Sequence, residues 1–210
     1  MIYPNEILGS LIYRTRKALN ENQNYLSGLK TYKYYPSLMT DGKINLWHYS
    51  GTFNEISERY LKNQDFDSCK VKFPAIFNYQ AVREDVSVDG SRSFTFNLAI
   101  VAPVDPEWKT EIRTELLWKP VLSGIYEEFL NQIRRFRPFQ NFNNFALSVP
   151  HTLYRIPTTG ISATENVKAI YAEYMDAYQI LGLRLKTGGI CASDLITIER
   201  ESREVSGIKI

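Results

Sequence analysis

The chain has 210 residues, of which 44% are hydrophobic and 23% are charged, and 25 basic against 23 acidic side chains give a formal net charge of +2. This composition is typical of a globular protein and excludes the disordered, collagen-like and disulfide-rich classes. We expect no signal peptide and no membrane span, because the first residues lack a basic and apolar leader and the apolar runs are short. The two cysteines imply no disulfide framework.

The first predicted element is an amphipathic helix over residues 5–19, in which apolar side chains recur at helical spacing and Asn5 is the expected N-cap. Basic side chains gather toward its C-terminal end. They either complement the negative end of the helix dipole or contact a nucleic acid, and both interpretations stay open. These basic residues are Arg14, Arg16 and Lys17.

A tyrosine-rich segment follows, between residues 29 and 46. Turn-forming residues surround its tyrosines, and this pattern predicts a short hairpin or an extended arm. The tyrosines are Tyr32, Tyr34 and Tyr35. A second helix is expected to begin at Thr52, because Thr52 and Glu55 have the spacing of a capping box, in which each side chain bonds the other residue's free backbone amide.

The clearest strand pattern lies between residues 71 and 102. Apolar and polar residues alternate over 71–79 and again over 93–100, which predicts two strands with one buried face each. The Asp89-Gly90 pair between them supplies the positive φ angles of a tight turn, so we expect the two strands to pair antiparallel. Pro74 has no amide hydrogen and is expected at a sheet edge or a bulge.

A long helical region is expected after the second strand. Asp105 is a suitable N-cap, and Pro106 suits the first helical position, where its missing amide hydrogen costs nothing. Pro120 is expected to bend or restart the helix. Beyond Pro120, apolar residues at every fourth position form a stripe wide enough to cover a sheet. This stripe consists of Val121, Ile125, Phe129 and Ile133.

The last third of the chain returns to strand patterns. Strands are expected around residues 145–149, over 181–186 and over 195–198. Residues 151–168 have a turn-forming composition and predict a long loop. Loops of this length in compact domains are often functional or bind a partner.

No known catalytic motif is present in the sequence. It contains no glycine-rich phosphate-binding loop, no His-Glu-x-x-His and no Gly-x-Ser-x-Gly. His48 and His151 are the two histidines, and they are too few and too far apart in sequence to build a histidine-rich metal site. Glu127 and Glu128 are neighbours on a predicted helix and therefore point in different directions. We predict no catalytic residue, no metal site and no cofactor.

One segment, residues 134–145, combines basic and aromatic side chains. Arginines beside aromatic rings suit the binding of single-stranded nucleic acid. Arginines at a helix C-terminus and phenylalanines at every third position also suit a helix end packed into a core, so both interpretations stay open. The residues concerned are Arg134, Arg135, Arg137, Phe136, Phe139, Phe142 and Phe145.

The order of these elements resembles that of the tail-terminator and tail-completion proteins of tailed bacteriophages. The motifs that carry the resemblance are Trp47-His-Tyr-Ser-Gly, Lys72-Phe-Pro-Ala-Ile, Asp105-Pro-Glu-Trp-Lys-Thr-Glu-Ile-Arg and Trp118-Lys-Pro-Val-Leu-Ser-Gly-Ile-Tyr-Glu-Glu-Phe-Leu, followed by Asn166, Asp176-Ala177 and the strand over 181–186. The resemblance implies an α+β fold, with an antiparallel β-sheet and helices packed on one face. It covers residues 44–187 and leaves an N-terminal helix and tyrosine-rich arm at 1–43 and a C-terminal extension at 188–210.

The resemblance also implies a non-enzymatic structural protein of the virion, assembled in the host cytoplasm. Its subunits form a hexameric or dodecameric ring at the neck or the top of the tail, next to other neck, portal-adaptor or tail proteins. Double-stranded DNA passes through the ring without sequence specificity, and no membrane is involved. The arginines of 134–137 then face DNA or an adjacent ring, and the tyrosine-rich arm reaches a neighbouring subunit.

Two other functions stay open from the sequence. A single-stranded nucleic-acid-binding accessory protein would use residues 134–145, and its affinity would fall with salt. An enzyme would use the 151–168 loop as a lid over a pocket that encloses His151 or perturbed carboxylates. No motif supports the enzyme in advance.

Overall fold

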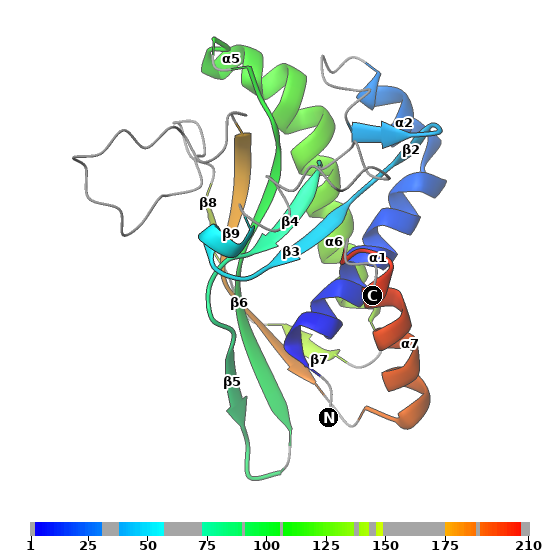
Figure 1. Ribbon diagram of the computed structural model, residues 1–210, viewed down its shortest axis with the longest axis vertical. Coiled ribbons are helices and arrows are strands. Elements are labelled where there is room, and N and C mark those ends of the chain that lie inside the picture. Colours follow the sequence, from blue (N-terminus) through cyan, green and yellow to red (C-terminus); the bar gives the residue numbers. More distant parts are fainter. Residues whose placement is uncertain are drawn as a thin grey trace, which may run out of the picture.

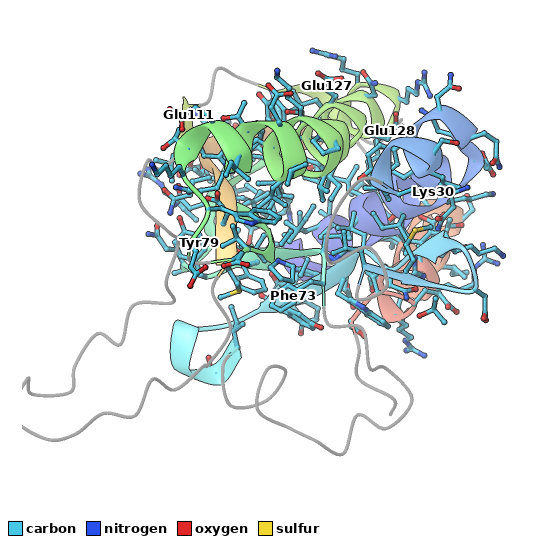
Figure 2. All side chains as sticks on the ribbon, turned by 90° about the horizontal axis from the view of Figure 1, so that it is seen from above. Lys30, Phe73, Tyr79, Glu111, Glu127 and Glu128 are labelled. Atoms are coloured by element: carbon cyan, nitrogen blue, oxygen red, sulfur yellow. The ribbon has the colours of Figure 1, made fainter. Side chains whose placement is uncertain are left out.

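The computed structural model describes residues 3–30, 38–56, 73–89, 91–105, 107–136, 139–142, 146–148, 175–187 and 190–206. These residues form an α+β fold, as expected. The long helices α1 and α6 pack on one face of a sheet, α7 packs against α1, and the short helix α4 lies on the other side of the sheet (Figures 1 and 2).

The elements follow one another along the chain with these bounds. The helices are α1 (Pro4–Glu21), α2 (Gln23–Leu29), α4 (Phe53–Ile56), α5 (Thr110–Arg113), the π-helical segment η2 (Thr114–Ser123), α6 (Gly124–Arg135) and α7 (Ala192–Arg203). The strands are β1 (Met39–Thr40), β2 (Lys43–Ile44), β3 (Trp47–Ser50), β4 (Ala75–Asn78), β5 (Arg83–Val86), β6 (Arg92–Pro103), β7 (Phe139–Phe142), β8 (Ala146–Ser148) and β9 (Met175–Thr187).

The main sheet has the strand order β3-β4-β6-β9-β7, with β5 pairing on β6 and β8 pairing on β9. Its pairs are antiparallel except for β3 and β4, which run parallel, so the sheet is mixed rather than purely antiparallel. A parallel pair needs a long crossover connection. Residues 51–74 provide the length for it between β3 and β4.

The expected antiparallel pairing of the two strands is confirmed, but the tight turn belongs to a different strand. β4 pairs with β6 from Ala75 opposite Val101 to Asn78 opposite Leu98. The turn near Asp89 joins β5 to β6. The sequence pattern did not predict the strand β5. β4 lies between β3 and β6 and is buried on both faces, so the prediction of a single buried face is wrong for it.

A bulge in β9 changes which of its residues face the helices. The register between β6 and β9 shifts between Phe96 and Leu98, and the extra residue lies in β9. Gly182 is at this position with a φ of +72°, a conformation that favours glycine. The helix-facing residues of β9 therefore have even numbers before the bulge and odd numbers after it. The alternation predicted over 181–186 holds from Leu183 onward.

Two helix starts differ from the prediction. α1 begins one residue before Asn5, and its N-cap is Tyr3, whose amide donates to the Glu6 carboxylate at 2.9 Å. The helix after β6 begins at Thr110, because Asp105 instead closes a local turn by accepting from the amide of Glu107 at 3.0 Å. The capping box of α4 and the buried stripe of α6 are confirmed.

Pro120 lies inside the helical region and coincides with the π-helical segment η2. Proline has no amide hydrogen and its ring crowds the preceding turn, so a wider turn relieves the conflict without ending the helix. Near this point the carbonyl of Val121 also accepts a hydrogen bond from the hydroxyl of Tyr25 at 3.3 Å. The hydrogen-bonding pattern of the helical region becomes π-helical around Pro120, and the region continues into α6 without a break.

The strand predicted over 195–198 is wrong, because this segment belongs to helix α7. The β-branched residues there favour a strand locally. Their tertiary contacts favour a helix, since Ile198 and Ser202 are buried one turn apart against α1 and Val205 is buried just beyond the helix. None of the described helices combines the length and hydropathy that crossing a membrane requires.

Candidate functional site

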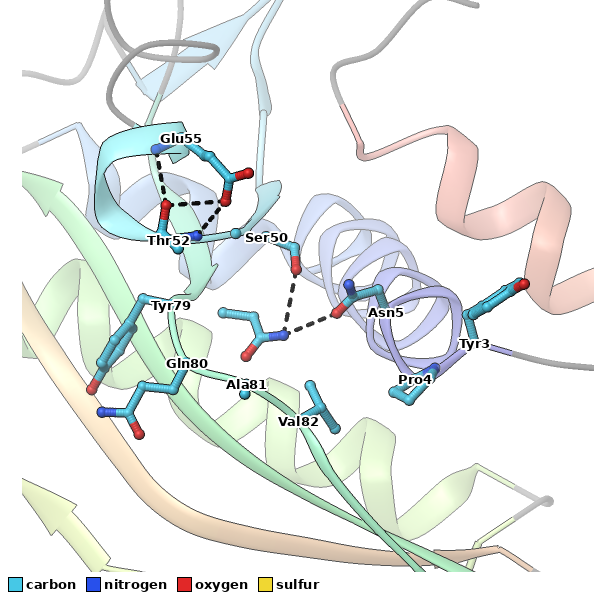
Figure 3. A pocket seen from close by; sticks show the side chains of 12 residues that line it. Tyr3, Pro4, Asn5, Ser50, Thr52, Glu55, Tyr79, Gln80, Ala81 and Val82 are labelled. Carbon is cyan, nitrogen blue, oxygen red and sulfur yellow. Dashed lines mark hydrogen bonds between the residues drawn. The ribbon is translucent and has the colours of Figure 1, made fainter.

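A cleft of about 440 Å³ opens where three distant segments of the chain meet. Its walls are the N-terminus of α1, the turn from β3 into α4 and the segment between β4 and β5 (Figure 3). Its volume lies within the range of small-molecule sites in proteins. The hydrogen-bonding side chains that line it are those of Asn5, Ser50, Thr52, Glu55, Asn78 and Gln80.

Asn78 forms the floor of the cleft at the end of β4, where its side chain is 2% exposed. Its Nδ2 donates to Asn5 Oδ1 at 2.9 Å and to Ser50 Oγ at 3.4 Å, and Figure 3 draws both bonds as dashed lines that start from the labelled Asn5 and Ser50. Its Oδ1 has no hydrogen-bond partner among the described residues. A buried carbonyl without a donor costs about 1–3 kcal/mol, so the fold holds the Asn78 side chain here at a cost to stability.

The turn that forms the second wall is held by the capping box of α4. The Glu55 carboxylate accepts from the amide of Thr52 at 2.8 Å and from its hydroxyl at 3.0 Å. Gly51 has a φ of +141°, and a Cβ there would lie 2.9 Å from Glu55 Oε2. Glycine is therefore required at this turn, and it lets the carboxylate fold back over the backbone.

His48 is buried beside the cleft wall, between α1 and the C-terminal segment. Its backbone amide donates to the carbonyl of Val205 at 3.0 Å, and its Nε2 has no partner among the described residues. Burial lowers the pKa of His48 from 6.5 to about 4, because the charged imidazolium would lose its hydration. The side chain is neutral at pH 7 and is enclosed by protein.

A second buried polar cluster lies at the other end of the sheet. The Asp176 carboxylate accepts from Arg113 Nε and from Trp118 Nε1, both at 2.6 Å, and from the amide of Ala177 at 2.9 Å. Arg113 is 3% exposed and Asp176 is fully buried. The Asp176 carboxylate is thus paired with the Arg113 guanidinium and with two N–H donors of the protein. This cluster fixes α5 and η2 on β9 and presents no open position to a substrate.

The arginines expected at the end of α6 are partly placed by the structure. Arg134 and Arg135 are exposed, and Arg137 lies outside the described residues. Phe136, in contrast, is 2% exposed, and the guanidinium of Arg14 lies 4.7 Å from its ring centroid. Phe136 therefore packs as a helix end in a core, which is one of the two interpretations of this segment.

Arg14, at the predicted basic end of α1, is also held by the protein. Its Nε donates to Glu201 of α7 at 2.8 Å, and Ser10 donates to the same carboxylate at 2.6 Å. Arg16 lies over the ring of Tyr13 at 5.5 Å. The bonds to Glu201 join α1 to α7, whereas Arg16 packs on Tyr13 of its own helix and lies 5.9 Å from the ring centroid of Trp47 in β3.

The other candidates from the sequence do not come together in one place. Glu127 is exposed while Glu128 accepts from Gln132 along the helix, so the two carboxylates diverge as expected. Among the described residues, no group of three His, Cys, Asp or Glu side chains is arranged to hold a metal ion. Three predicted positions or segments lie outside the described residues: the tyrosine arm with Tyr32, Tyr34 and Tyr35, His151, and the 151–168 loop.

A β-hairpin projects from the body of the molecule. β5 and the first half of β6 extend past the helices, at the lower end of Figure 1. Val86 is 66% exposed, and Val88, in the turn, is fully exposed. Within the described residues no strand pairs with the outer edge of β5. The hairpin therefore presents apolar side chains and an open strand edge to a partner.

Comparisons of the chain with protein-family models, with curated proteins and with solved structures give no match. The function is therefore inferred from the sequence and from the projecting hairpin. Sequence patterns gave no signal for the cleft, because residues 5, 50 and 78 meet only in the folded chain. The exposed valines next to the Asp89-Gly90 turn were a usable signal for the hairpin tip.

Proposed function

We propose that this protein is a non-enzymatic structural subunit of a tailed-bacteriophage virion. It forms a homo-oligomeric ring at the neck or the top of the tail, joins the head and portal side to the tail and lets DNA pass. The location in the virion rests on the resemblance of residues 44–187 to tail-terminator and tail-completion proteins. The self-association rests on the projecting β5–β6 hairpin.

The hairpin supports self-association because two apolar side chains, Val86 and Val88, are exposed at and beside its turn. Val86 ends β5 and Val88 lies in the turn that follows, and both expose their side chains. β6, the partner of β5, pairs with β9 on its other side. An exposed apolar tip is unfavourable in an isolated subunit and gains free energy when a partner covers it.

The chemistry of the hairpin also favours a specific partner over nonspecific aggregation. Arg83 pairs with Asp85 at 3.0 Å, Arg92 pairs with Glu84 at 3.3 Å, and Arg184 reaches Asp85 at 3.5 Å. Charges along an edge strand discourage uncontrolled edge-to-edge pairing, and they give a correct partner a pattern to match. A ring needs such a contact between two different faces of neighbouring subunits.

The nucleic-acid-binding alternative has less support. It requires aromatic rings that are free to stack on bases beside Arg134 and Arg135. Phe136, the aromatic residue between these arginines and Arg137, is buried and is covered by Arg14. Arg134 and Arg135 are exposed and stay candidates for contacts to DNA or to an adjacent ring, with Arg134 also donating to Asn131 Oδ1 at 3.2 Å.

The proposal is tested by the mass of the purified protein in solution. Light scattering over a concentration series, with negative-stain imaging of any large species, is expected to give a closed ring of six or twelve subunits. The double variant Val86→Lys/Val88→Lys is expected to shift the mass toward the monomer, because two buried apolar contacts become charged. Ile196→Lys is the matched control, since Ile196 is 70% exposed on α7, away from the hairpin.

Two results would contradict the proposal. A ring of unchanged mass in the double variant would mean that the hairpin does not form the contact. A wild-type monomer at every concentration, together with single-stranded DNA binding that weakens with salt, would favour the accessory protein instead. Thermal unfolding of each variant shows whether a change in mass comes from loss of folding.

A further inference from the structure

The hairpin end of the main sheet has an open strand edge on each side. At this level the strands follow the order β5-β6-β9-β7, and Figure 1 shows β5 and β7 on opposite sides of the β6–β9 pair. In the part of the chain that the structure describes, neither β5 nor β7 pairs with a strand on its outer side. Unpaired N–H and C=O groups at such an edge bond readily to a strand of another chain.

The strand registers put these two edges at the same level of the sheet. Val86 of β5 and Phe139 of β7 end one row of paired residues, and Glu84 and Phe142 end a second row. The rows run through Arg92 and Thr187 in the first case and through Phe94 and Leu185 in the second. Three antiparallel pairings separate β5 from β7, so the two edge strands run in opposite directions. Two copies that stand side by side with their hairpins pointing the same way would therefore bring β5 and β7 together antiparallel.

The hydrogen-bonding pattern decides which backbone groups of β5 point outward. The amide of Ser87 donates to the carbonyl of Ser91 at 2.9 Å, so these two residues form a hydrogen-bonded pair. Bonded and non-bonded pairs alternate along antiparallel strands. Val86 and Glu84 therefore belong to non-bonded pairs with β6, and their N–H and C=O groups point away from β6 to the open side.

The same alternation, carried across the sheet, gives the outward groups of β7. The β6 residues that turn away from β5 bond β9, so Lys186 of β9, which lies between those bonded rows, turns toward β7 and its partner Asn141. Phe142, next to Asn141, and Phe139, opposite Thr187, therefore direct their backbone groups outward. Both edges thus present their free backbone groups in the same two rows.

The residue types favour the pairing of β5 with β7 of another copy over the pairing of β5 with a second β5. Two β5 strands paired about their centre would set Asp85 opposite Asp85, and like charges directly opposite each other destabilise a sheet. β7 has the sequence Phe-Gln-Asn-Phe and sets no charge opposite β5. An uncharged edge therefore accepts the charged edge without repulsion.

We propose that β5 of one subunit pairs antiparallel with β7 of the next, so that the hairpin ends of the subunits join into one continuous sheet. The proposal rests on the ring of the proposed function and specifies its contact, in which Val86 bonds Phe139 and Glu84 bonds Phe142 through the backbone. Each subunit uses both edges, so the contact is head-to-tail. A closed sheet staggers its strands, and a stagger of two residues keeps the outward groups opposite one another.

The test is a disulfide between the two edges in the full-length protein. Cys69 and Cys191 are first replaced by serine, and Asp85→Cys is combined with Asn141→Cys. Within one subunit β6 and β9 separate these positions by three strand spacings, about 14 Å, which a disulfide cannot span. Between subunits they form a directly opposed pair. We expect mild oxidation to give a ladder of linked subunits on a non-reducing gel, ending at the number of subunits in the ring.

Further cysteine pairs cover a stagger and provide the control. Arg83→Cys and Ser87→Cys, each combined with Asn141→Cys, test shifts of two residues in either direction. Asp85→Cys with Gln132→Cys is the matched control, because Gln132 is an amide side chain on α6 and does not lie on β7. The control should give no ladder. Asp85→Cys alone and Asn141→Cys alone should each stay unlinked, and mixing them should give a dimer of one chain of each kind.

The outcomes separate this contact from the ring itself. A ring in which all three cysteine pairs stay unlinked would overturn the strand contact and leave the proposed function standing. A dimer from Asp85→Cys alone would show a two-fold pairing of β5 and would also overturn it. A protein that is monomeric at every concentration and forms no link contradicts the ring and the strand contact together. Thermal unfolding of each reduced variant shows that the chains compared are folded.

Discussion

His48 illustrates how a single residue couples the fold to pH. Its imidazole is enclosed between α1 and the segment that ends at Val205, and a Cβ at Gly9 would lie 3.5 Å from its Nδ1. The burial that lowers its pKa to about 4 also leaves its Nε2 without a partner among the described residues. A proton added to this ring would place a charge where burial removes its hydration, between α1 and the segment at Val205.

We predict that this histidine makes the protein less stable in mild acid. Between pH 6.5 and about 4 the unfolded chain binds a proton at His48 that the native protein does not bind. The free energy of unfolding therefore falls as the pH decreases through this window, by about 3 kcal/mol in total, and is fully retained above pH 6.5. Urea unfolding of the wild type and of His48→Leu at pH 7.5, 6, 5 and 4 measures the effect.

The comparison with His48→Leu isolates this residue, because all other titrating groups are the same in both chains. The leucine variant should lose less stability between pH 7.5 and 4 than the wild type. Equal losses in the two proteins would mean that His48 is accessible to protons in the folded state.

At the scale of elements, the contact between α1 and α7 depends on a small residue. A Cβ built at Gly9 would lie 2.7 Å from Ser202 Cβ and 3.0 Å from Ser202 Cα, so the helix backbones approach closely at this point. The same pair of helices is joined by Ser10 and Arg14, which both bond Glu201. Gly9 allows the backbones of α1 and α7 to approach, and the bonds to Glu201 fix the register of the two helices.

We predict that Gly9→Ala destabilises the protein by about 1–3 kcal/mol, because α7 must move away from α1 to accept the methyl group. Gly28→Ala is the matched control, since a Cβ at Gly28 in α2 would meet nothing within 4 Å. Alanine there should be neutral or stabilise by up to about 1 kcal/mol, through helix propensity. Chemical denaturation measures both variants. Equal stabilities would show that α7 is not packed on α1 as described.

Elements with local chemistry were predictable from the sequence, and elements decided by distant contacts were not. The capping box at Thr52 and the stripe through Phe129 depend on near neighbours, and both are confirmed. α7 was read as a strand because its packing on α1 brings together residues almost 200 positions apart. Asn5 was assigned to a helix cap, but its side chain bonds Asn78 across the fold, and the cleft arises from that bond.

For the whole molecule, α1 is part of the core and cannot serve as a removable arm. Its Ile7, Leu8, Leu11 and Ile12 are all fully buried. Deleting residues 1–43 would expose this face and unfold the protein, so such a deletion cannot test assembly. The contribution of the tyrosine-rich arm is better tested by substituting Tyr32, Tyr34 and Tyr35 with serine while α1 is kept.

If the arm of one subunit meets the hairpin of the next, the two surfaces are different halves of one contact. We then predict that the triple tyrosine variant and the Val86→Lys/Val88→Lys variant are each monomeric. Mixed in equal amounts, the two variants should form a dimer and no larger species. The variant without the three tyrosines still has an intact hairpin, and the Val86→Lys/Val88→Lys variant still has an intact arm. Only one productive contact remains in the mixture, and a ring cannot close.

Light scattering of the mixture distinguishes this arrangement from a symmetric one. A two-fold contact would pair arm and hairpin twice and would stop the wild type at a dimer, whereas a head-to-tail contact lets the wild type continue to a ring. A mixture that stays monomeric would therefore exclude a head-to-tail contact between arm and hairpin. A dimer of one subunit of each kind, formed from variants of a wild type that assembles beyond a dimer, would show that the contact is directional, which is the property that a ring around a central channel requires.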